Sequence, residues 1–205
     1  MPNLIALRLV VVLLLVGASV AASAGSARAE PAGARFHVEA EYYKLDNGLR
    51  VVLARDVSAP TVTVGVYYGV GFRVEPRGRT GFAHLFEHLM FQGSENLPDF
   101  FNSIAAAGGQ IGGSTRFDFT RYWETAPTNQ LEFMLWGEAD RMARPVIQSE
   151  KLANQKAVVA NEVKAALHNQ PYGGWTWLEL PQAAFRNWHN AHNFYGDLQD
   201  IEAAT

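Results

Sequence analysis

Residues 81–91 read Gly-Phe-Ala-His-Leu-Phe-Glu-His-Leu-Met-Phe, and the interpretation of the whole chain starts from this pattern. An α-helix advances by roughly 100° per residue, so His88 falls near 40° from His84, and Glu87 falls near 300°. The apolar side chains fall between roughly 100° and 240°; they are Phe82, Leu85, Phe86, Leu89 and Met90. The stretch therefore predicts an amphipathic helix with a narrow His/Glu/His face.

Two histidines at positions i and i+4 of a helix can place two imidazole nitrogens on one metal ion. The alternative is an ordinary polar helix face on which both histidines have hydrogen-bond partners. The amphipathic setting, the preceding glycine-rich segment 69–78 and the absence of cysteine from the chain favour the metal site.

Glu162 is the candidate third ligand, because it lies on a later predicted helix within a stripe of alanine and valine side chains. A carboxylate in such a stripe is costly unless it is paired or metal-bound. The alternative is a glutamate at the edge of the stripe that reaches water. Two imidazoles and one carboxylate form the ligand set of a catalytic zinc site, and Glu87 can then act as the general base.

The N-terminus has the layout of a secretory signal peptide over residues 1–29. Arg8 precedes the apolar run 9–16, and small residues follow up to Ala27-Arg28-Ala29. Cleavage is expected after Ala29, and residues 22–24 offer a second cleavage site. An uncleaved membrane anchor is the alternative, although the apolar run is shorter than the roughly 20 residues of a transmembrane helix. We therefore expect an exported protein, periplasmic or secreted, with no membrane segment after the signal is removed.

Residues 30–205 carry 15 Lys and Arg against 20 Asp and Glu, which gives a formal charge of −5. An acidic domain of this kind lacks the excess of positive charge that is typical of nucleic-acid-binding proteins. The lack of cysteine excludes disulfides, thiolate metal sites and cysteine catalysis, so stability must come from an apolar core. With 48% hydrophobic residues, the chain has the material for one.

Alternating and helical periodicities predict an α+β fold, with an antiparallel sheet and helices packed on one face. Asn47-Gly48 between two β-type runs predicts a hairpin. Strands are further expected at 61–68 and 117–125. Helices are expected at 80–93, 98–107, from 127 to just before Pro145, and from Ser149 to about 167. We expect one domain over residues 30–205.

The chain resembles the pitrilysin (insulinase-like) family of zinc peptidases, whose motif has the His-x-x-Glu-His order of the inverzincins. The resemblance extends beyond residues 81–91 to four other segments. They are Leu45-Asp46-Asn47-Gly48-Leu49, Gly71-Phe72-Arg73-Val74-Glu75, Val158-Val159-Ala160-Asn161-Glu162 and Asn169-Gln170-Pro171-Tyr172-Gly173. It covers almost all of residues 30–205.

The resemblance implies a zinc endopeptidase that holds one zinc ion per chain with His84, His88 and Glu162, and uses Glu87 as the base. It implies hydrolysis of peptides or unfolded segments that bind as an added strand along a sheet edge, formed by Gly112, Gly113, Ser114 and Thr115. It also implies a second homologous half-domain, downstream in the chain or on a partner subunit, that closes over the peptide substrate.

Three positions depart from the family pattern. Gly112 stands where asparagine is common, so substrate positioning there lacks a side chain. Gln155 stands where many members have a glutamate beside the ligands; it can still hydrogen-bond but brings no charge. Asn190 replaces the proline that commonly follows the residue at His189, and we interpret His189 and His192 as surface or structural residues.

The chain stops soon after Ile201, so it resembles a half-domain truncated before its last helices and strand, and we expect a fragment of a longer reading frame. Two alternatives to an active endopeptidase stay open. One is a non-catalytic peptide-binding partner or scaffold subunit of the same fold. The other is a fragment that binds zinc but cannot close a chamber. Manganese or cobalt could also occupy a site with two nitrogens and one oxygen.

Overall fold

A computed structural model describes residues 37–205, whose contacts fall into two units with the division between Asp56 and Val57. The predicted signal peptide, residues 1–29, lies outside the described residues. Within 37–205, no helix combines the length and the apolar character needed to cross a bilayer.

The first unit contains the predicted hairpin. Strands β1 (Ala40–Lys44) and β2 (Arg50–Ala54) pair antiparallel, with Lys44 opposite Arg50. Gly48 has a φ of 93°, a conformation that glycine adopts without strain, and the Asn47 side chain accepts a hydrogen bond from the Leu49 N–H at 3.0 Å. The Asn-Gly turn is therefore confirmed by its geometry.

The second unit contains an antiparallel sheet of three strands in the order β3-β5-β4. They are β3 (Thr61–Tyr68), β4 (Gln110–Thr115) and β5 (Thr120–Pro127). Burial alternates along β5, where every second residue from Thr120 is buried. This alternation gives the sheet one covered face and one open face.

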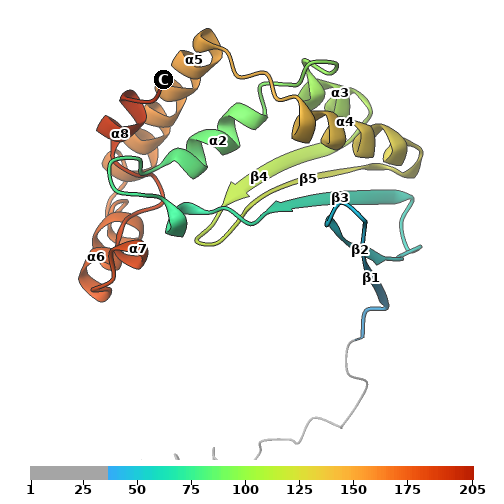
Figure 1. The fold of residues 1–205 in the computed structure, drawn as a ribbon, viewed down its shortest axis with the longest axis horizontal. Helices are drawn as coiled ribbons and strands as arrows, with labels where there is room; N and C mark the ends of the chain where they lie inside the picture. The colour runs from blue at the N-terminus through green and yellow to red at the C-terminus, as the bar shows by residue number, and fades with distance from the viewer. Residues whose placement is uncertain (1–36) are drawn as a thin grey trace, which may run out of the picture. The chain divides into compact units, whose positions relative to one another are not determined.

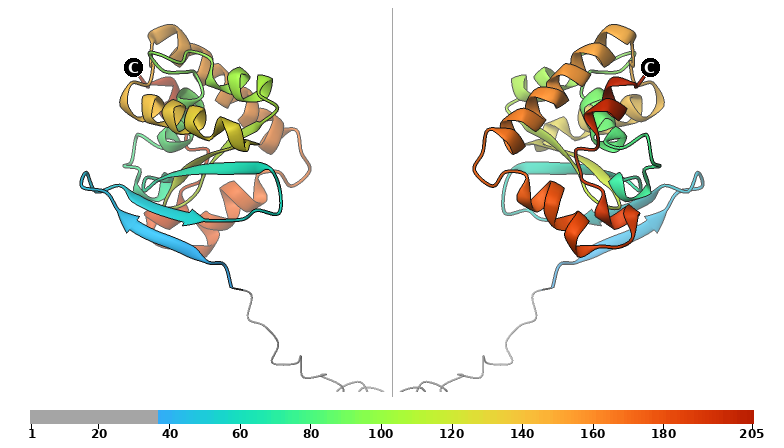
Figure 2. Two further views of the ribbon diagram at one scale, coloured as in Figure 1. Left: turned by 90° about the vertical axis from the view of Figure 1, so that its right-hand side faces the viewer. Right: turned by 90° about the vertical axis from the view of Figure 1, so that its left-hand side faces the viewer.

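The helices α2, α3 and α4 cover one face of this sheet, and α5 packs beside α2 (Figures 1 and 2). These helices are α2 (Phe82–Met90), α3 (Phe100–Ala106), α4 (Leu131–Ala143) and α5 (Ser149–Val163). Shorter elements are η1 (Phe72–Val74), η2 (Thr128–Gln130), η3 (Lys164–His168), η4 (Trp175–Glu179), α6 (Leu180–Ala184), α7 (Trp188–Ala191) and α8 (Leu198–Glu202). The predicted α+β class with helices on one face is confirmed.

Two apolar clusters hold the layers together. The first lies between α2, α5 and α8, and consists of Leu85, Leu89, Val159, Val163, Leu167, Tyr195 and Ile201. The second lies between α3, α4 and the sheet, and consists of Phe100, Ile104, Ala126 and Met134. The first cluster fixes α2 against α5, the two helices that carry the candidate metal ligands.

The structure shifts several predicted boundaries. The strand expected from residue 117 begins at Thr120, because Phe117 lies in the turn before it and packs on Phe72, with ring centroids 4.4 Å apart. The helix expected from residue 98 begins at Phe100, because Asp99 caps it by accepting the Asn102 N–H. The helix expected to end near residue 93 ends at Met90, and a turn follows in which Gly93 has a φ of 90°.

Candidate metal centre

Helix α2 begins at Phe82, within two residues of the predicted start, and its first turn is held by groups from elsewhere in the chain. Gly81 has a φ of 80°, and a Cβ atom there would lie 2.4 Å from the Tyr195 carbonyl oxygen. The buried Glu75 carboxylate accepts the N–H of Gly81 at 2.9 Å and of Ala83 at 2.7 Å. These contacts fix the rotation of the helix that carries His84 and His88.

The three predicted ligands converge on one point. The Nε2 atoms of His84 and His88 lie 3.2 Å apart. One Glu162 oxygen lies 3.6 Å from His84 Nε2 and 3.2 Å from His88 Nε2. Among the described residues, these three form a group whose ligand atoms all lie within 4.8 Å of one another. Side chains 78 positions apart in the sequence are thus brought together by the packing of α2 on α5.

The two imidazoles have different electrostatic environments. Burial lowers the pKa of His84 to about 4, an effect that the nearby Glu162 carboxylate only partly offsets. Burial also lowers the pKa of His88, but its hydrogen bond to Glu162 and the charges of Glu162 and Glu87 outweigh burial and raise it overall. A neutral His84 presents a lone pair, as a metal ligand must.

Glu162 and Gln155 lie on the same helix, seven residues apart. The hydrogen bond from His88 lowers the pKa of Glu162, so this carboxylate is ionised at neutral pH. The side chain of Gln155 is buried close to His88, and it contributes to raising the pKa of that imidazole. Gln155 therefore lies where a side chain can orient a ligand without adding charge to the site.

Glu87 faces β4 from the same side of α2. Thr115, which is 1% exposed, donates a hydrogen bond from its hydroxyl to Glu87 Oε2 at 2.6 Å. Burial raises the pKa of Glu87, and the Thr115 hydrogen bond opposes the rise. A Cβ atom on Gly113 would lie 3.1 Å from Glu87 Oε1 and 2.9 Å from Phe91, so glycine leaves the space that this carboxylate occupies.

The four residues predicted to bind substrate all lie at the C-terminal end of β4, but on two faces. Gly113 and Thr115 face α2, whereas Gly112 and Ser114 face the open side of the sheet. The Trp123 indole fills the space above Gly112, where a Cβ atom would lie 2.7 Å from the ring. Glycine at position 112 thus leaves room for an aromatic ring from β5.

The sequence interpretation missed the residues that hold the site from outside it. Asp200 accepts the N–H and hydroxyl of Thr80 at 2.9 and 2.7 Å, and the Phe194 ring lies 4.4 Å from His84. His192 lies 3.5 Å from Glu75 and is buried, which agrees with a structural role. Only Glu75 gave a sequence signal, as an acidic residue ahead of a helix start.

The donor set fits a zinc ion. Two imidazole nitrogens and one carboxylate oxygen converge, and no cationic side chain contacts them among the described residues. Zinc prefers these donor types, usually with three protein ligands where the metal is catalytic.

The family model for Insulinase (Peptidase family M16) matches residues 50–196. The chain is 32% identical over 149 residues to the zinc protease PqqE of Helicobacter pylori, covering 69% of this chain and 34% of that protein. It is 28% identical over 124 residues to the uncharacterized zinc protease YmxG of Bacillus subtilis, covering 60% of this chain and 30% of that protein. The chain thus spans about one third of the length of these relatives.

Solved structures share the fold of this chain. A protease from Helicobacter pylori superimposes with a TM-score of 0.76 at 28% identity, over 82% of this chain and 41% of that one. The fold also matches the periplasmic protease PqqL from Escherichia coli, with a TM-score of 0.73 at 19% identity, over 84% of this chain and 20% of that one. The chain belongs to the insulinase family, peptidase family M16.

Proposed function

We propose that the chain is the metal-binding and catalytic half of a zinc-dependent endopeptidase. The observation that carries this proposal is the convergence of His84 Nε2, His88 Nε2 and a Glu162 oxygen within 4.8 Å, with Glu87 on the same helix face. His84, His88 and Glu162 would hold one zinc ion per chain. When bound, zinc would supply a Lewis acid that polarises the scissile carbonyl and lowers the pKa of a water molecule.

Glu87 is the residue that moves the proton. Its carboxylate takes a proton from the attacking water and delivers it to the nitrogen of the leaving amine, so that the peptide bond is replaced by an acid and an amine. Thr115 holds one oxygen of Glu87 through a 2.6 Å hydrogen bond. Burial keeps the pKa of Glu87 above its ordinary value, which makes the group a stronger base once it is ionised.

The substrate lies along β4 as an added strand. β4 pairs with β5 on one side and forms an edge of the three-stranded sheet. An extended peptide on that edge would use the backbone of Gly112, Gly113, Ser114 and Thr115 for hydrogen bonds. It would also lie next to Glu87, which contacts Thr115.

A second homologous half-domain completes the enzyme, and residues 30–205 act as the first. Support comes from the length of the relatives and from the solved first half of the protease PqqL, which matches with a TM-score of 0.72 over 81% of this chain. Residues 1–29 would direct export, to the periplasm or out of the cell. PqqL, which is described as periplasmic, supports that location.

A non-catalytic peptide-binding subunit of the same fold is the second candidate. The chain is 27% identical over 128 residues to cytochrome b-c1 complex subunit 1 of Bos taurus, covering 62% of this chain and 26% of that protein. The presence of the general base together with all three ligands favours the peptidase.

Metal content tests the proposal most directly. The processed chain, with its companion half-domain, is expected to hold about one zinc, and Glu162→Gln to lose it or bind it far more weakly. Glu87→Gln is expected to keep zinc and to abolish cleavage of a quenched peptide. Folded, unmutated protein without zinc would overturn the metallopeptidase and leave the peptide-binding subunit. Zinc without cleavage would identify an inactive fragment.

A further inference from the structure

The open face of the sheet, turned away from α2, α3 and α4, has an unusual composition. Because side chains alternate along strands, the residues on this face can be assigned from the burial pattern and the strand register. They are Thr61, Thr63, Gly65 and Tyr67 of β3, Arg121, Trp123 and Thr125 of β5, and Gln110, Gly112 and Ser114 of β4. None is acidic, although the chain carries a net charge of −3.

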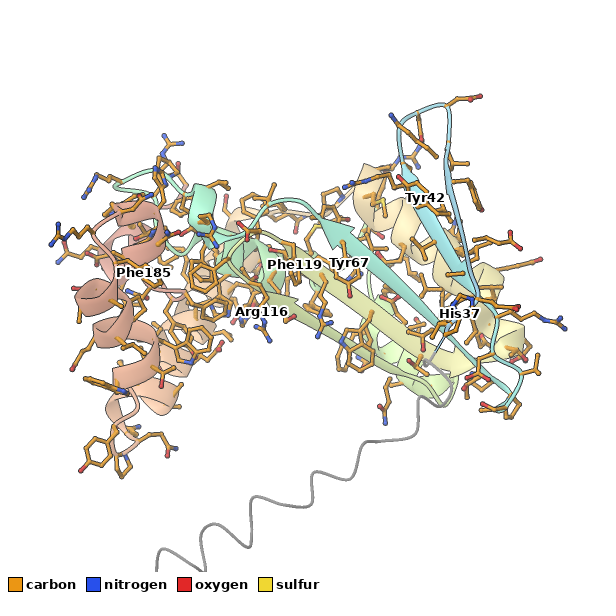
Figure 3. The ribbon with its side chains drawn as sticks, turned by 90° about the horizontal axis from the view of Figure 1, so that it is seen from below. His37, Tyr42, Tyr67, Arg116, Phe119 and Phe185 are labelled. Carbon is orange, nitrogen blue, oxygen red and sulfur yellow. The ribbon has the colours of Figure 1, made fainter. Side chains whose placement is uncertain are left out.

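Two arginines carry the charge of this face. Arg121 lies on the central strand, and Arg116 follows the end of β4; Figure 3 looks onto this face and shows Arg116 with Tyr67 and Phe119. Within residues 37–205, neither arginine forms an ion pair, whereas the nearby Asp118 pairs with Arg73 at 2.6 Å. The open face is therefore cationic around the β4–β5 turn, near the end of the free edge strand.

The guanidinium of Arg121 is held in place. Its Nε donates to the Ser114 hydroxyl at 3.0 Å, and one terminal nitrogen lies 3.4 Å from the Tyr67 hydroxyl. The Tyr67 ring in turn contacts Phe119, with centroids 5.5 Å apart. Arginine has five N–H donors, so others remain for a ligand, and little side-chain entropy is left to lose on binding.

Arg121 lies close enough to the β4 edge for a side chain of a bound peptide to reach it. Ser114 of β4 lies directly opposite Arg121, between it and the free edge. A strand added to β4 would lie roughly 10 Å from β5, two strand spacings away, and would place every second side chain on the open face. An extended aspartate or glutamate there can meet an arginine across Ser114.

We propose that the chain selects peptides with an acidic side chain, which Arg121 binds with the help of Arg116. This inference rests on the proposed function, because it requires the substrate to lie along β4. Because side chains alternate along a strand, the proposal also predicts which substrate positions show the preference. The acidic residue is favoured only at alternate substrate positions, those whose side chains reach the open face.

Paired peptides test this selection. A quenched peptide of constant sequence carries one glutamate, moved through successive positions, and each version is compared with glutamine at the same position. The assay uses the zinc-loaded protein with its companion half-domain. We expect kcat/KM to be about three- to tenfold higher for glutamate than for glutamine at alternate positions, and equal for the two peptides at the intervening positions. Higher salt is expected to reduce the ratio.

Variants assign the preference to the arginines. Arg121→Gln is expected to bring the glutamate-to-glutamine ratio close to one, and Arg116→Gln to reduce it. Arg186→Gln, at an exposed arginine beyond α6, is expected to keep it. Because the ratio compares two peptides on the same protein, partial unfolding of a variant lowers both rates and leaves the ratio interpretable.

A binding measurement tests the selection of acidic peptides independently of the proposed peptidase activity. The Glu87→Gln variant, titrated with the same peptides carrying a fluorophore, gives an affinity ratio that does not depend on cleavage. A ratio above one without hydrolysis by the unmutated protein would count against the peptidase and support the acidic selection. Equal affinities, no binding, or a preference at consecutive positions would overturn the selection, whether or not peptides are cleaved.

Discussion

At the scale of single residues, Gly112 and Gly113 are neighbours on β4, but a side chain introduced at each position would contact different groups. A Cβ atom on Gly113 would point at Glu87 and Phe91, at 3.1 and 2.9 Å, beneath α2. A Cβ atom on Gly112 would meet the Trp123 ring at 2.7 Å, on the open face. Glu87 is held in place by its hydrogen bond from Thr115, whereas Trp123 lies on the open face and can turn outward.

Gly113→Ala is therefore expected to displace Glu87 and to lower kcat by about tenfold or more, because small misplacements of a catalytic group are costly. Zinc content should stay near that of the unmutated protein. Gly112→Ala is the matched control, with a smaller loss of kcat. Steady-state kinetics and metal analysis on both variants check this, and equal losses of kcat would contradict it.

Gln155 allows a second prediction at the residue scale. Its amide is buried close to His88 and helps to raise the pKa of that imidazole, so Gln155→Leu is expected to weaken zinc binding by about tenfold or more, because the ring loses a polar neighbour. Gln155→Glu should preserve or strengthen binding, since it keeps the acceptor and adds negative charge. Competition with a chelator measures both. Asn154→Leu, at an exposed neighbour on the same helix, should leave affinity unchanged.

At the scale of elements, the N-terminus of α2 depends on a carboxylate that is not part of the helix. Glu75 accepts two N–H groups that the helix itself leaves unpaired. In Glu75→Gln the amide offers one acceptor oxygen and turns its NH2 toward a backbone donor. We expect a loss of about 1.5–3 kcal/mol of stability and weaker zinc binding, because the helix start is free to rotate.

Thermal unfolding and chelator competition on Glu75→Gln measure both effects. The control is Glu150→Gln, since Glu150 is an exposed acid in the first turn of α5. Loss of stability with unchanged zinc affinity would restrict Glu75 to a structural role.

The elements that the sequence predicted correctly are those with local causes. The periodicity of α2 and the Asn47-Gly48 turn both act within a few residues, and both are present. The prediction that His84 and Glu162 bind one metal ion had two sources. One was a carboxylate in an apolar stripe together with two histidines on another helix, and the other was the family resemblance. The geometry places these side chains together.

Other elements had no local signal. The segment Gln110–Thr115 contains two glycines and little β-pattern, and it becomes a strand by pairing with β5. The contact between Gly81 and the Tyr195 carbonyl joins segments more than a hundred residues apart. Such contacts depend on tertiary packing, which overrides local propensity.

At the scale of the whole molecule, a buried charge network joins the sheet to α4. Arg141, which is 2% exposed, contacts Glu124 of β5 at 3.2 Å and also pairs with Glu138. Its guanidinium also lies 4.3 Å from the centre of the Tyr122 ring. Two acidic side chains thus share one buried guanidinium, and removing Arg141 would leave buried acidic groups without their cationic partner, at a cost of about 3–5 kcal/mol.

This network predicts the pH dependence of stability. Burial, the hydrogen bond with Glu138 and the repulsion between the two carboxylates raise the pKa of Glu124 from 4.5 to about 9. The folded state therefore retains a proton that the unfolded state releases above pH 4.5. Stability from this group is complete below pH 4.5 and is lost as the pH rises toward 9, by at most about 1.4 kcal/mol per pH unit.

Glu124→Gln isolates this contribution, because glutamine keeps the shape and hydrogen-bonding capacity of the protonated acid but cannot ionise. Denaturant unfolding between pH 5 and 9 should show the unmutated protein losing stability relative to the variant as the pH rises. Glu132→Gln, at an exposed acid in the first turn of α4, should follow the unmutated protein. Parallel curves for Glu124→Gln and the unmutated protein would mean that Glu124 is ionised in the folded state, with Arg141 compensating both carboxylates.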